Sequence, residues 1–312
     1  MSEPRSYHGQ PVIKEPIWTW EIPCYFFTGG LGGASAGLAY LSEVRGNDVL
    51  ARRAWITALA GVGVSPVLLI SDLGRPARFF NMLRMFKVTS PMSVGSWILS
   101  VSGAATTVAA ANAWLGVFPR LSRAARPLAA LAGLPLSTYT AALIANTAVP
   151  AWHEARGELP FVFAAGAAMS AAGAATAVTP PQHAGPARRV ALAGATAELV
   201  AHKVMQRRMG EHSAPYEQPI PKRFKRASQA AVASGAALVA ASGRGSRAAA
   251  VAGGGLLLAG GLAARWSIFK AGLVAAADPK YTVGPQREGI ESGNRPGAAR
   301  TEARPATART PA

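Results

Sequence analysis

Residues 159–179 read LPFVFAAGAAMSAAGAATAVT, an apolar run without a single charged side chain. A helix crosses the hydrocarbon core of a bilayer in about 20 residues, so this run is long enough to span a membrane. Four more charge-free runs of similar length come before it. They cover residues 22–42, 54–71, 94–118 and 127–151. The pattern predicts five membrane-spanning helices in this part of the sequence.

Three further spans are predicted in the second half of the sequence. Residues 190–209 form the sixth, although this stretch contains the ionisable Glu198 and His202. Its polar later half leaves an interfacial amphipathic helix as the alternative. Residues 227–243 and 248–264 form the seventh and eighth, separated by a short basic turn. We therefore expect an all-α integral membrane protein, a bundle of about eight transmembrane helices.

The protein divides into three predicted parts. Residues 1–21 form an N-terminal extramembrane segment, residues 22–277 the membrane domain, and residues 278–312 a C-terminal extension. A polar segment precedes the first span, so we do not expect that span to be a cleaved signal peptide. Arg265 and the residues after it are interpreted as the exit from the membrane. From about residue 288 the extension lacks apolar periodicity, so we expect it to be disordered.

The high net charge, combined with long runs that contain no charged residue, excludes the class of ordinary soluble proteins. The net charge is +17, yet half of the residues are hydrophobic and the charge is absent from run after run. We expect lipid as the surrounding solvent and no nucleic-acid partner. With an even number of spans, both termini lie on the same side of the membrane. Of the 32 Lys and Arg residues, 22 fall on that side and 10 on the other, so the positive-inside rule places the termini in the cytoplasm.

The sequence offers few ligands for a redox metal. Cys24 is its single cysteine, so the protein alone cannot build a disulfide or a thiolate-held cluster. His202 is the one histidine within a predicted span, whereas a bis-histidine haem site needs two. We expect no metal, haem or iron–sulfur cluster in this protein, so any electrons must come from a partner with its own cofactors.

The most distinctive stretch is SDLGRPARFFNMLRMFK, residues 71–87. Gly74 and Pro76 are expected to turn the backbone out of a regular helix. Asp72 stands among several cations, which predicts ion pairs at the level of the lipid headgroups. A solvated loop in contact with phospholipid is the alternative interpretation.

Other residues are candidates because of where they lie in the spans. Residues 29–37 read GGLGGASAG; no strand precedes them, so close helix packing is favoured over a nucleotide loop. Tyr139 places a phenol in lipid, where its hydroxyl needs a partner and can donate to a carbonyl. Glu198 and His202 are four residues apart and share a helix face, so proton transfer, ion passage or a structural ion pair are all open.

Four separate motifs resemble one known family. They are WTWEIPCYFFTGGLGG (18–33), SDLGRPARFFNMLRMFKVTSPMSVGSW (71–97), TYTAALIANTAVPAW (138–152), and RWSIFKAG with DPKYTVGPQR (between 265 and 287). Together they resemble the NrfD/polysulfide reductase membrane-subunit family from about Pro16 to Arg287. The resemblance implies an eight-helix, haem-free subunit that binds menaquinone or ubiquinone in the cell membrane. It also implies an iron–sulfur partner subunit and, in many complexes, a molybdopterin catalytic subunit.

The resemblance further implies a quinone pocket between the first four helices, near the side that carries the termini. Tyr139 would donate to a quinone carbonyl, and the other members of the binding set would be Tyr25, Thr28 and Asn146. A loop and proton-relay set would consist of Asp72, Arg75, Arg78, Glu198 and His202. On this reading the protein is a quinone-reactive subunit and not a complete enzyme by itself. A secondary transporter and a purely structural anchor are the alternatives.

Overall fold

The computed structural model describes residues 13–75, 77–281 and 283, and the described residues form helices and no strands. The predicted all-α bundle is confirmed. Its eight long helices are α1 (Glu21–Val44), α2 (Asp48–Asp72), α4 (Pro91–Leu115), α5 (Pro119–Ala145), α7 (Leu159–Val178), α8 (Gly185–Met209), α9 (Pro219–Ala241) and α10 (Arg247–Ala277). The connecting elements are α3 (Ala77–Leu83), α6 (Pro150–His153), η1 (Gly210–Glu217) and η2 (Ser242–Arg244). The disorder predicted from residue 288 lies outside the described residues.

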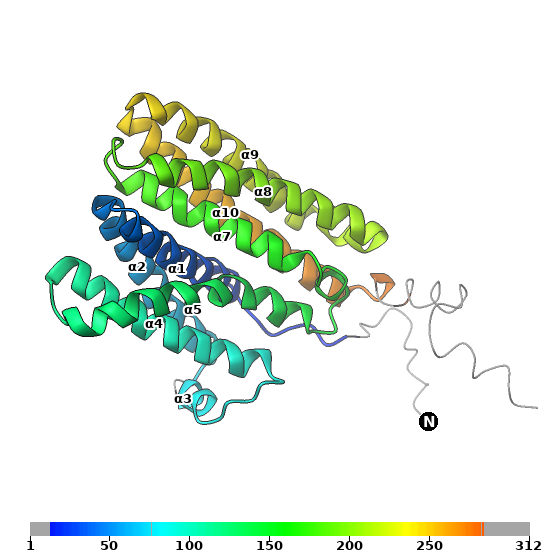
Figure 1. Cartoon of the computed structure of the whole chain (residues 1–312). Helices are drawn as coiled ribbons and strands as arrows, with labels where there is room; N and C mark the ends of the chain where they lie inside the picture. The colour runs from blue at the N-terminus through cyan, green and yellow to red at the C-terminus, as the bar shows by residue number, and fades with distance from the viewer. Residues whose placement is uncertain (1–12, 76, 282, 284–312) are drawn as a thin grey trace, which may run out of the picture.

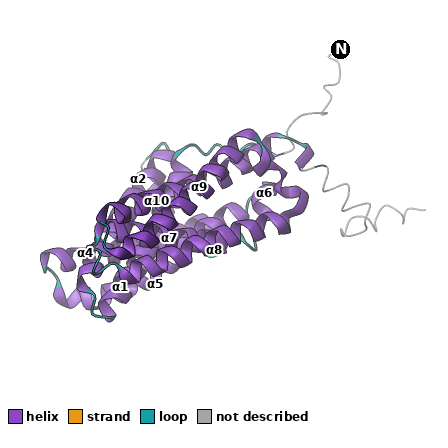
Figure 2. Cartoon of the chain, turned by 90° about the horizontal axis from the view of Figure 1, so that it is seen from above, coloured by secondary structure: helices purple, strands orange, loops and turns teal. Residues whose placement is uncertain are grey.

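Five of the long helices, α2, α4, α5, α7 and α10, are long and apolar enough to cross a membrane. The remaining three, α1, α8 and α9, carry more charge or less hydropathy but pack in the same bundle (Figure 2). Helix α8 buries its Ala187, Ala191, Glu198 and His202 against its neighbours, which argues against the interfacial alternative for this span. The protein is therefore built as an integral membrane bundle.

The eight helices form two groups of four (Figure 1). Helices α1, α2, α4 and α5 pack together as the first unit, and helices α7, α8, α9 and α10 as the second unit. Helix α7 joins them by packing against α1, α2 and α5. The division follows the order of the sequence, so each unit is built from consecutive spans.

Glycines let helices approach closely in both units. A Cβ atom on Gly33 of α1 would lie 2.3 Å from the carbonyl oxygen of Gly133 in α5, so no larger residue fits there. In the second unit a Cβ atom on Gly254 of α10 would lie 2.4 Å from the carbonyl oxygen of Gly173 in α7. The glycine-rich start of the first span therefore serves helix packing, as its sequence indicates.

The structure corrects the ends of two predicted spans. Helix α5 begins at Pro119 and ends at Ala145, where Asn146 caps it, so the predicted span at 127–151 lies too far toward the C-terminus. Helix α10 continues to Ala277, beyond the predicted end of the eighth span. Arg265 is consequently not at a membrane exit: it lies in the middle of α10 and is 2 % exposed. The helix continues because no proline interrupts the sequence from Arg247 to Asp278, and the Arg265 side chain packs against Phe163 of α7.

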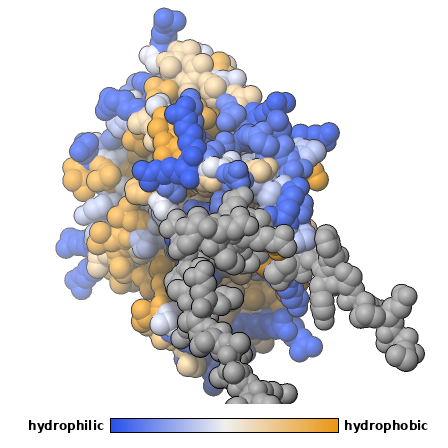
Figure 3. All heavy atoms as spheres, turned by 90° about the vertical axis from the view of Figure 1, so that its right-hand side faces the viewer, coloured by the Kyte–Doolittle hydropathy of each residue, from blue (hydrophilic) through white to orange (hydrophobic). Residues whose placement is uncertain are grey.

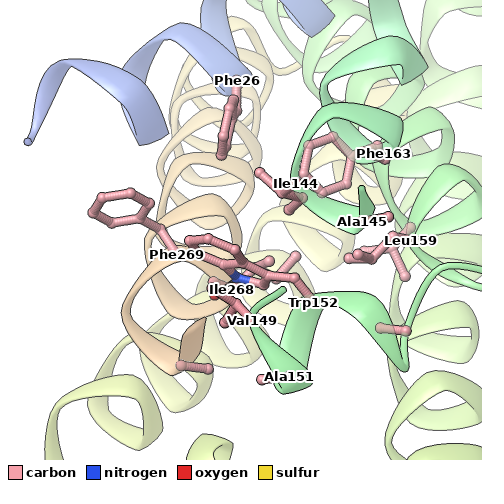
Figure 4. Close-up of a cluster of buried hydrophobic side chains, with 14 of the residues drawn as sticks. Phe26, Ile144, Ala145, Val149, Ala151, Trp152, Leu159, Phe163, Ile268 and Phe269 are labelled. Atoms are coloured by element: carbon pink, nitrogen blue, oxygen red, sulfur yellow. Dashed lines mark hydrogen bonds between the residues drawn. The ribbon is translucent and has the colours of Figure 1, made fainter. Parts of the chain in front are cut away.

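An aromatic core joins the two units (Figure 4). The indole of Trp152, from α6, stacks on Phe269 of α10 with ring centroids 6.2 Å apart, and its Nε1 donates to the carbonyl oxygen of Ile268 at 2.8 Å. Gly272 leaves room for this indole, since a Cβ atom there would lie 1.9 Å from its Cε2. Phe26 of α1 and Phe163 of α7 extend the core, with ring centroids 5.9 Å apart.

The start of α1 and the end of α10 lie at the same end of the bundle (Figure 1). Figure 3 views this end, where hydrophilic side chains surround the centre and hydrophobic ones gather along one flank. We call it the terminal end. The placement of this end in the cytoplasm stays a prediction from the charge distribution.

Candidate functional site

A small cavity of about 40 Å³ lies inside the first unit near its terminal end. Every helix of the first unit contributes to its wall, as does the short helix α3. Its lining residues are Trp18, Ile22, Tyr25, Leu69, Asp72, Leu73, Met82, Met92, Ser96, Tyr139 and Leu143. The structure therefore brings together three residues that the sequence analysis singled out, Tyr25, Tyr139 and Asp72.

The two tyrosines meet edge to face across this cavity. Their ring centroids are 6.4 Å apart at an interplanar angle of 65°. Tyr25 is 1 % exposed, and its hydroxyl has no hydrogen-bond partner among the described residues. A buried hydroxyl normally finds a partner, so this one marks a position where a ligand or a water accepts or donates. Gly95 of α4 makes room for Tyr139, because a Cβ atom there would lie 2.1 Å from the ring atom Cε2.

Asp72, the last residue of α2, reaches the same cavity from the terminal end. Its carboxylate lies near the backbone N–H of Thr19 and near the carboxylate of Glu21. Glu21 is also largely buried, 9 % exposed, and accepts a hydrogen bond from the Thr19 hydroxyl. Two carboxylates therefore stand where the cavity meets the terminal end, of which the sequence analysis found only Asp72.

The predicted ion pairs around Asp72 are wrong for the described part of the protein, where no ion pair within 4.0 Å includes it. Gly74 adopts a positive φ of 68° and turns the backbone away from α2, as its sequence position predicts. Arg75 is exposed on the loop beyond it, and Arg78 is exposed on α3. Arg78 instead donates from Nη1 to the carbonyl oxygen of Leu73 at 3.0 Å.

Two of the predicted quinone-binding residues do not line the cavity. The Thr28 hydroxyl lies 2.9 Å from the Ser65 hydroxyl, so it joins α1 to α2. Asn146 is exposed at the end of α5, and its Nδ2 donates to the carbonyl oxygen of Ala142 at 2.8 Å. Both residues lie on the predicted spans, but neither lines the cavity.

The sequence analysis missed most of the apolar wall. The spacing of apolar residues could have identified part of this wall. Ile22 precedes Tyr25 by three residues, and Leu143 follows Tyr139 by four. Residues at these spacings share a helix face, so each tyrosine predicts an apolar neighbour in the same wall. Met82 and Met92 had no such signal, since they come from the short helix α3 and from the start of α4.

A second polar site lies inside the second unit. Glu198 and His202 of α8 are 2 % and 8 % exposed, and Arg265 of α10 is 2 % exposed. Arg265 donates from Nη2 to the carbonyl oxygen of Phe163 at 2.9 Å, and its guanidinium carbon lies 3.9 Å from the centroid of the Phe163 ring. Within the described residues, Glu198 Oε1, His202 Nε2 and the Nε and Nη1 atoms of Arg265 have no hydrogen-bond partner. We call these three residues the buried charge cluster.

The buried charge cluster is separate from the cavity of the first unit. Glu198 and His202 border a void of about 10 Å³ together with Lys225, Ser228 and Gln229, and no residue lines both spaces. The rings of Phe26 and Phe163 stand between the two sites. The structure therefore does not bring Glu198 and His202 to the predicted quinone pocket.

Neither site has the composition of a metal centre. No group of three or more His, Cys, Asp or Glu side chains suited to hold a metal ion occurs among the described residues. The first site offers hydroxyls, two carboxylates and aromatic walls, which suit an uncharged ring with hydrogen-bond acceptors and an exchange of protons. The second offers ionisable groups without a space for a ligand larger than water.

Comparison with known proteins places these sites in context. The model of the family described as "Polysulphide reductase, NrfD" matches residues 7–180, more than half of the sequence. The C subunit of polysulfide reductase from Wolinella succinogenes is 31 % identical over 85 residues. That alignment covers 25 % of this protein and 27 % of the relative, so the protein spans about a quarter of the curated relative that it matches. The first unit and its cavity lie in the region matched by the family model, whereas α8, α9 and α10 lie beyond it.

Proposed function

Because this protein belongs to the NrfD family, we propose that it is the membrane subunit of an oxidoreductase complex and binds quinone in the cavity of the first unit. In this proposal a partner iron–sulfur subunit docks at the terminal end and exchanges electrons with the quinone. A molybdopterin catalytic subunit completes the complex. The protein itself is the quinone-reactive part of an enzyme and carries no reaction alone.

The observation that carries the proposal is the buried Tyr25 hydroxyl without a partner in the described residues, on a ring that meets Tyr139 edge to face at the wall of the cavity. A quinone presents two carbonyl oxygens that accept hydrogen bonds, and a phenol hydroxyl is a donor of matching chemistry. Aromatic and apolar side chains around the two hydroxyls suit the ring.

The cavity is too small to hold a quinone ring without a rearrangement of its wall. About 40 Å³ is far below the roughly 300–1,000 Å³ of typical ligand pockets, so binding of the ring requires side chains to move. Met82 and Met92 are the lining side chains best suited to move aside, since an unbranched thioether adapts to its surroundings. Helix α3, which carries Met82, buries none of its side chains, so displacing it costs little packing.

Quinone supplies the redox chemistry when bound, accepting or releasing two electrons with two protons. The protein's own residues bind and orient it through the Tyr25 and Tyr139 hydroxyls. Asp72 and Glu21 hold protons between the cavity and the aqueous terminal end. Arg75 on the adjoining loop and Arg78 on α3 stay at the surface, where they suit contacts with lipid headgroups or the partner subunit.

The buried charge cluster favours a second candidate function, proton translocation through the second unit. Ionisable side chains at membrane depth without a partner are typical of proton paths. Because the aromatic rings of Phe26 and Phe163 separate Glu198 and His202 from the cavity, this path would run beside the quinone site. A secondary transporter would use the same residues without any quinone.

The decisive experiment compares Tyr25→Phe and Tyr139→Phe in the purified complex. Each change removes one hydroxyl and little volume, so we expect a loss of about 1 kcal/mol in quinone binding, roughly fivefold in quinol-linked turnover. Tyr40→Phe on α1 is the matched control, since Tyr40 lies outside the cavity. Bound quinone is measured by mass spectrometry in parallel. Unchanged turnover and unchanged quinone content in both variants would reject the assigned site.

Glu198→Gln separates the two candidate functions. If Glu198 moves protons in a separate path, the variant retains quinol-linked turnover but moves fewer protons across vesicle membranes per electron. If the protein is a transporter independent of quinone, its transport is lost in Glu198→Gln and survives removal of quinone.

A further inference from the structure

A large basic cavity lies at the end of the bundle opposite to the terminal end, away from both sites described above. Its volume is about 730 Å³. Three arginines line it: Arg53 of α2, Arg188 of α8 and Arg247 at the start of α10. Gln182 and the glycines of the α9–α10 turn complete its polar wall, and none of the described residues that line it is acidic.

The arginines are held in place without a carboxylate partner. Arg188 donates from Nη1 to the carbonyl oxygen of Pro181 at 2.9 Å, and Arg247 donates from Nη1 to the carbonyl oxygen of Thr179 at 2.9 Å. Arg53 lies over the indole of Trp114, 5.4 Å from the ring centroid. None of the three takes part in an ion pair within the described residues. Three like charges around one space repel each other, and an anion between them removes that repulsion.

A hydrogen bond between the two units and a glycine turn fix the backbone around the cavity. Asn47, the N-cap of α2, donates from Nδ2 to the carbonyl oxygen of His183 at 2.9 Å, which ties the first unit to the α7–α8 loop. Gly245 has a φ of 92°, a conformation that glycine adopts without strain, and it turns the backbone from α9 into α10. Helices α8 and α10 both begin beside the cavity, so their positive ends add to the attraction for an anion.

The position of the cavity selects the kind of anion. It lies where the long helices end, at the level of lipid headgroups. Val178, the last residue of α7, lines it and is 39 % exposed, so an apolar surface adjoins the arginines. A phosphate with acyl chains attached satisfies both features, because its charge meets the guanidinium groups and its acyl chains follow the helix surface.

We propose that this cavity binds the phosphate headgroup of an anionic phospholipid, which bridges the two units of the bundle. Arg53 contributes from the first unit, and Arg188 and Arg247 contribute from the second. The bound lipid would stabilise the contact between the units at the end where the aromatic core does not reach. This inference does not depend on quinone binding.

The test measures lipid retention by native mass spectrometry on the full-length protein, purified in mild detergent and supplied with phosphatidylglycerol or phosphatidylcholine. We expect the wild type to retain phosphatidylglycerol and to melt at a higher temperature with it than with phosphatidylcholine. The double variant Arg188→Gln with Arg247→Gln should retain roughly tenfold less, since each arginine near the headgroup contributes to attraction. The matched control is Arg120→Gln with Arg123→Gln, two exposed arginines at the same end that do not line the cavity.

Two further arms keep the result interpretable. Arg53→Gln breaks no hydrogen bond to a described carbonyl, so it tests the site without risk to the loops of the second unit if the double variant does not fold. Inorganic phosphate at the same phosphate concentration distinguishes a lipid from a free anion. Equal retention in Arg53→Gln and the wild type, equal loss in the control variant, or equal stabilisation by inorganic phosphate would each overturn the proposal.

Discussion

In each of the two four-helix units every helix packs against the next one along the sequence, and the last packs against the first (Figure 1). The two units differ in what they enclose. The first unit encloses a cavity whose polar lining includes two tyrosines, Ser96 and, at its edge, Asp72. The second unit encloses Glu198, His202 and Arg265, with almost no empty space. The comparison shows that close helix packing supports both a ligand cavity and a buried charge cluster within one protein.

In each unit a glycine makes room for the functional side chains. Gly95 of α4 faces the ring of Tyr139 in the first unit. Gly166 of α7 faces the buried charge cluster of the second unit, because a Cβ atom there would lie 3.0 Å from Arg265 Nη2 and 3.3 Å from Glu198 Oε1. In both sites a large polar side chain therefore packs against a glycine of the neighbouring helix.

The largest effect is expected in the second unit, for Arg265→Gln. Removing this cation takes away the donor to the buried carbonyl oxygen of Phe163, the charge over the Phe163 ring and the cation beside Glu198, which together cost about 3–5 kcal/mol. Glu198→Gln combined with Arg265→Gln should recover part of the loss, because the buried carboxylate is then neutral as well. Thermal unfolding of the detergent-solubilised protein measures this double-mutant cycle. Additive losses would show that the two side chains are not coupled, and the comparison between the units would fail.

A smaller effect, confined to the first unit, is expected for Gly95→Ala. The added methyl group meets the ring of Tyr139, so the ring must shift at a cost of about 1–3 kcal/mol, and quinol-linked turnover should fall. Gly103→Ala on the same helix is the control, since nothing lies within 4 Å of a Cβ atom there and both variants gain the same helix propensity. If the two variants have equal turnover and equal stability, the position of Tyr139 does not matter for the reaction.

The smallest effect is expected at the edge of the second unit, where Glu217 of η1 lies 3.0 Å from Lys222 and also pairs with Lys225. Hydrogen bonds from Lys225 and Lys222 lower the pKa of Glu217 from its usual 4.5. A lowered pKa contributes stability above pH 4.5 that is lost as the pH falls through the folded-state value. Glu217 is 52 % exposed, so the contribution is at most about 0.5 kcal/mol.

Unfolding measurements between pH 6 and pH 3 check this prediction. The wild type should lose slightly more stability on acidification than Glu217→Gln does. Glu211→Gln, a change at another exposed acid of η1, is the control and should follow the wild type. A larger acid sensitivity in Glu217→Gln than in the wild type would show that the lysines do not stabilise the carboxylate.

The candidate site was only partly predictable, for reasons that its residues make plain. Tyr139 and Asp72 were found because a phenol within a span and an acid among cations at the end of one are unusual, whereas Tyr25 was assigned from the family resemblance. Thr28 and Asn146 were assigned to the same site from the family resemblance, because they belong to the matching motifs. Whether such a side chain reaches the cavity depends on how its helix is rotated about its axis. Here the Thr28 hydroxyl lies against Ser65 of α2, and the Asn146 side chain bonds back to the end of α5.

The sequence by itself determined that this protein is a bundle of membrane helices with a resemblance to one family. Long apolar runs have one stable solution in lipid, since a helix satisfies every backbone group internally. Only the tertiary structure decided which polar groups meet. The approach of α4 to α5 joins Tyr139 to the cavity, and the continuation of α10 buries Arg265 beside Glu198. Contacts between helices that are distant in the sequence depend on close packing at small residues, so the hydropathy of the sequence does not predict them.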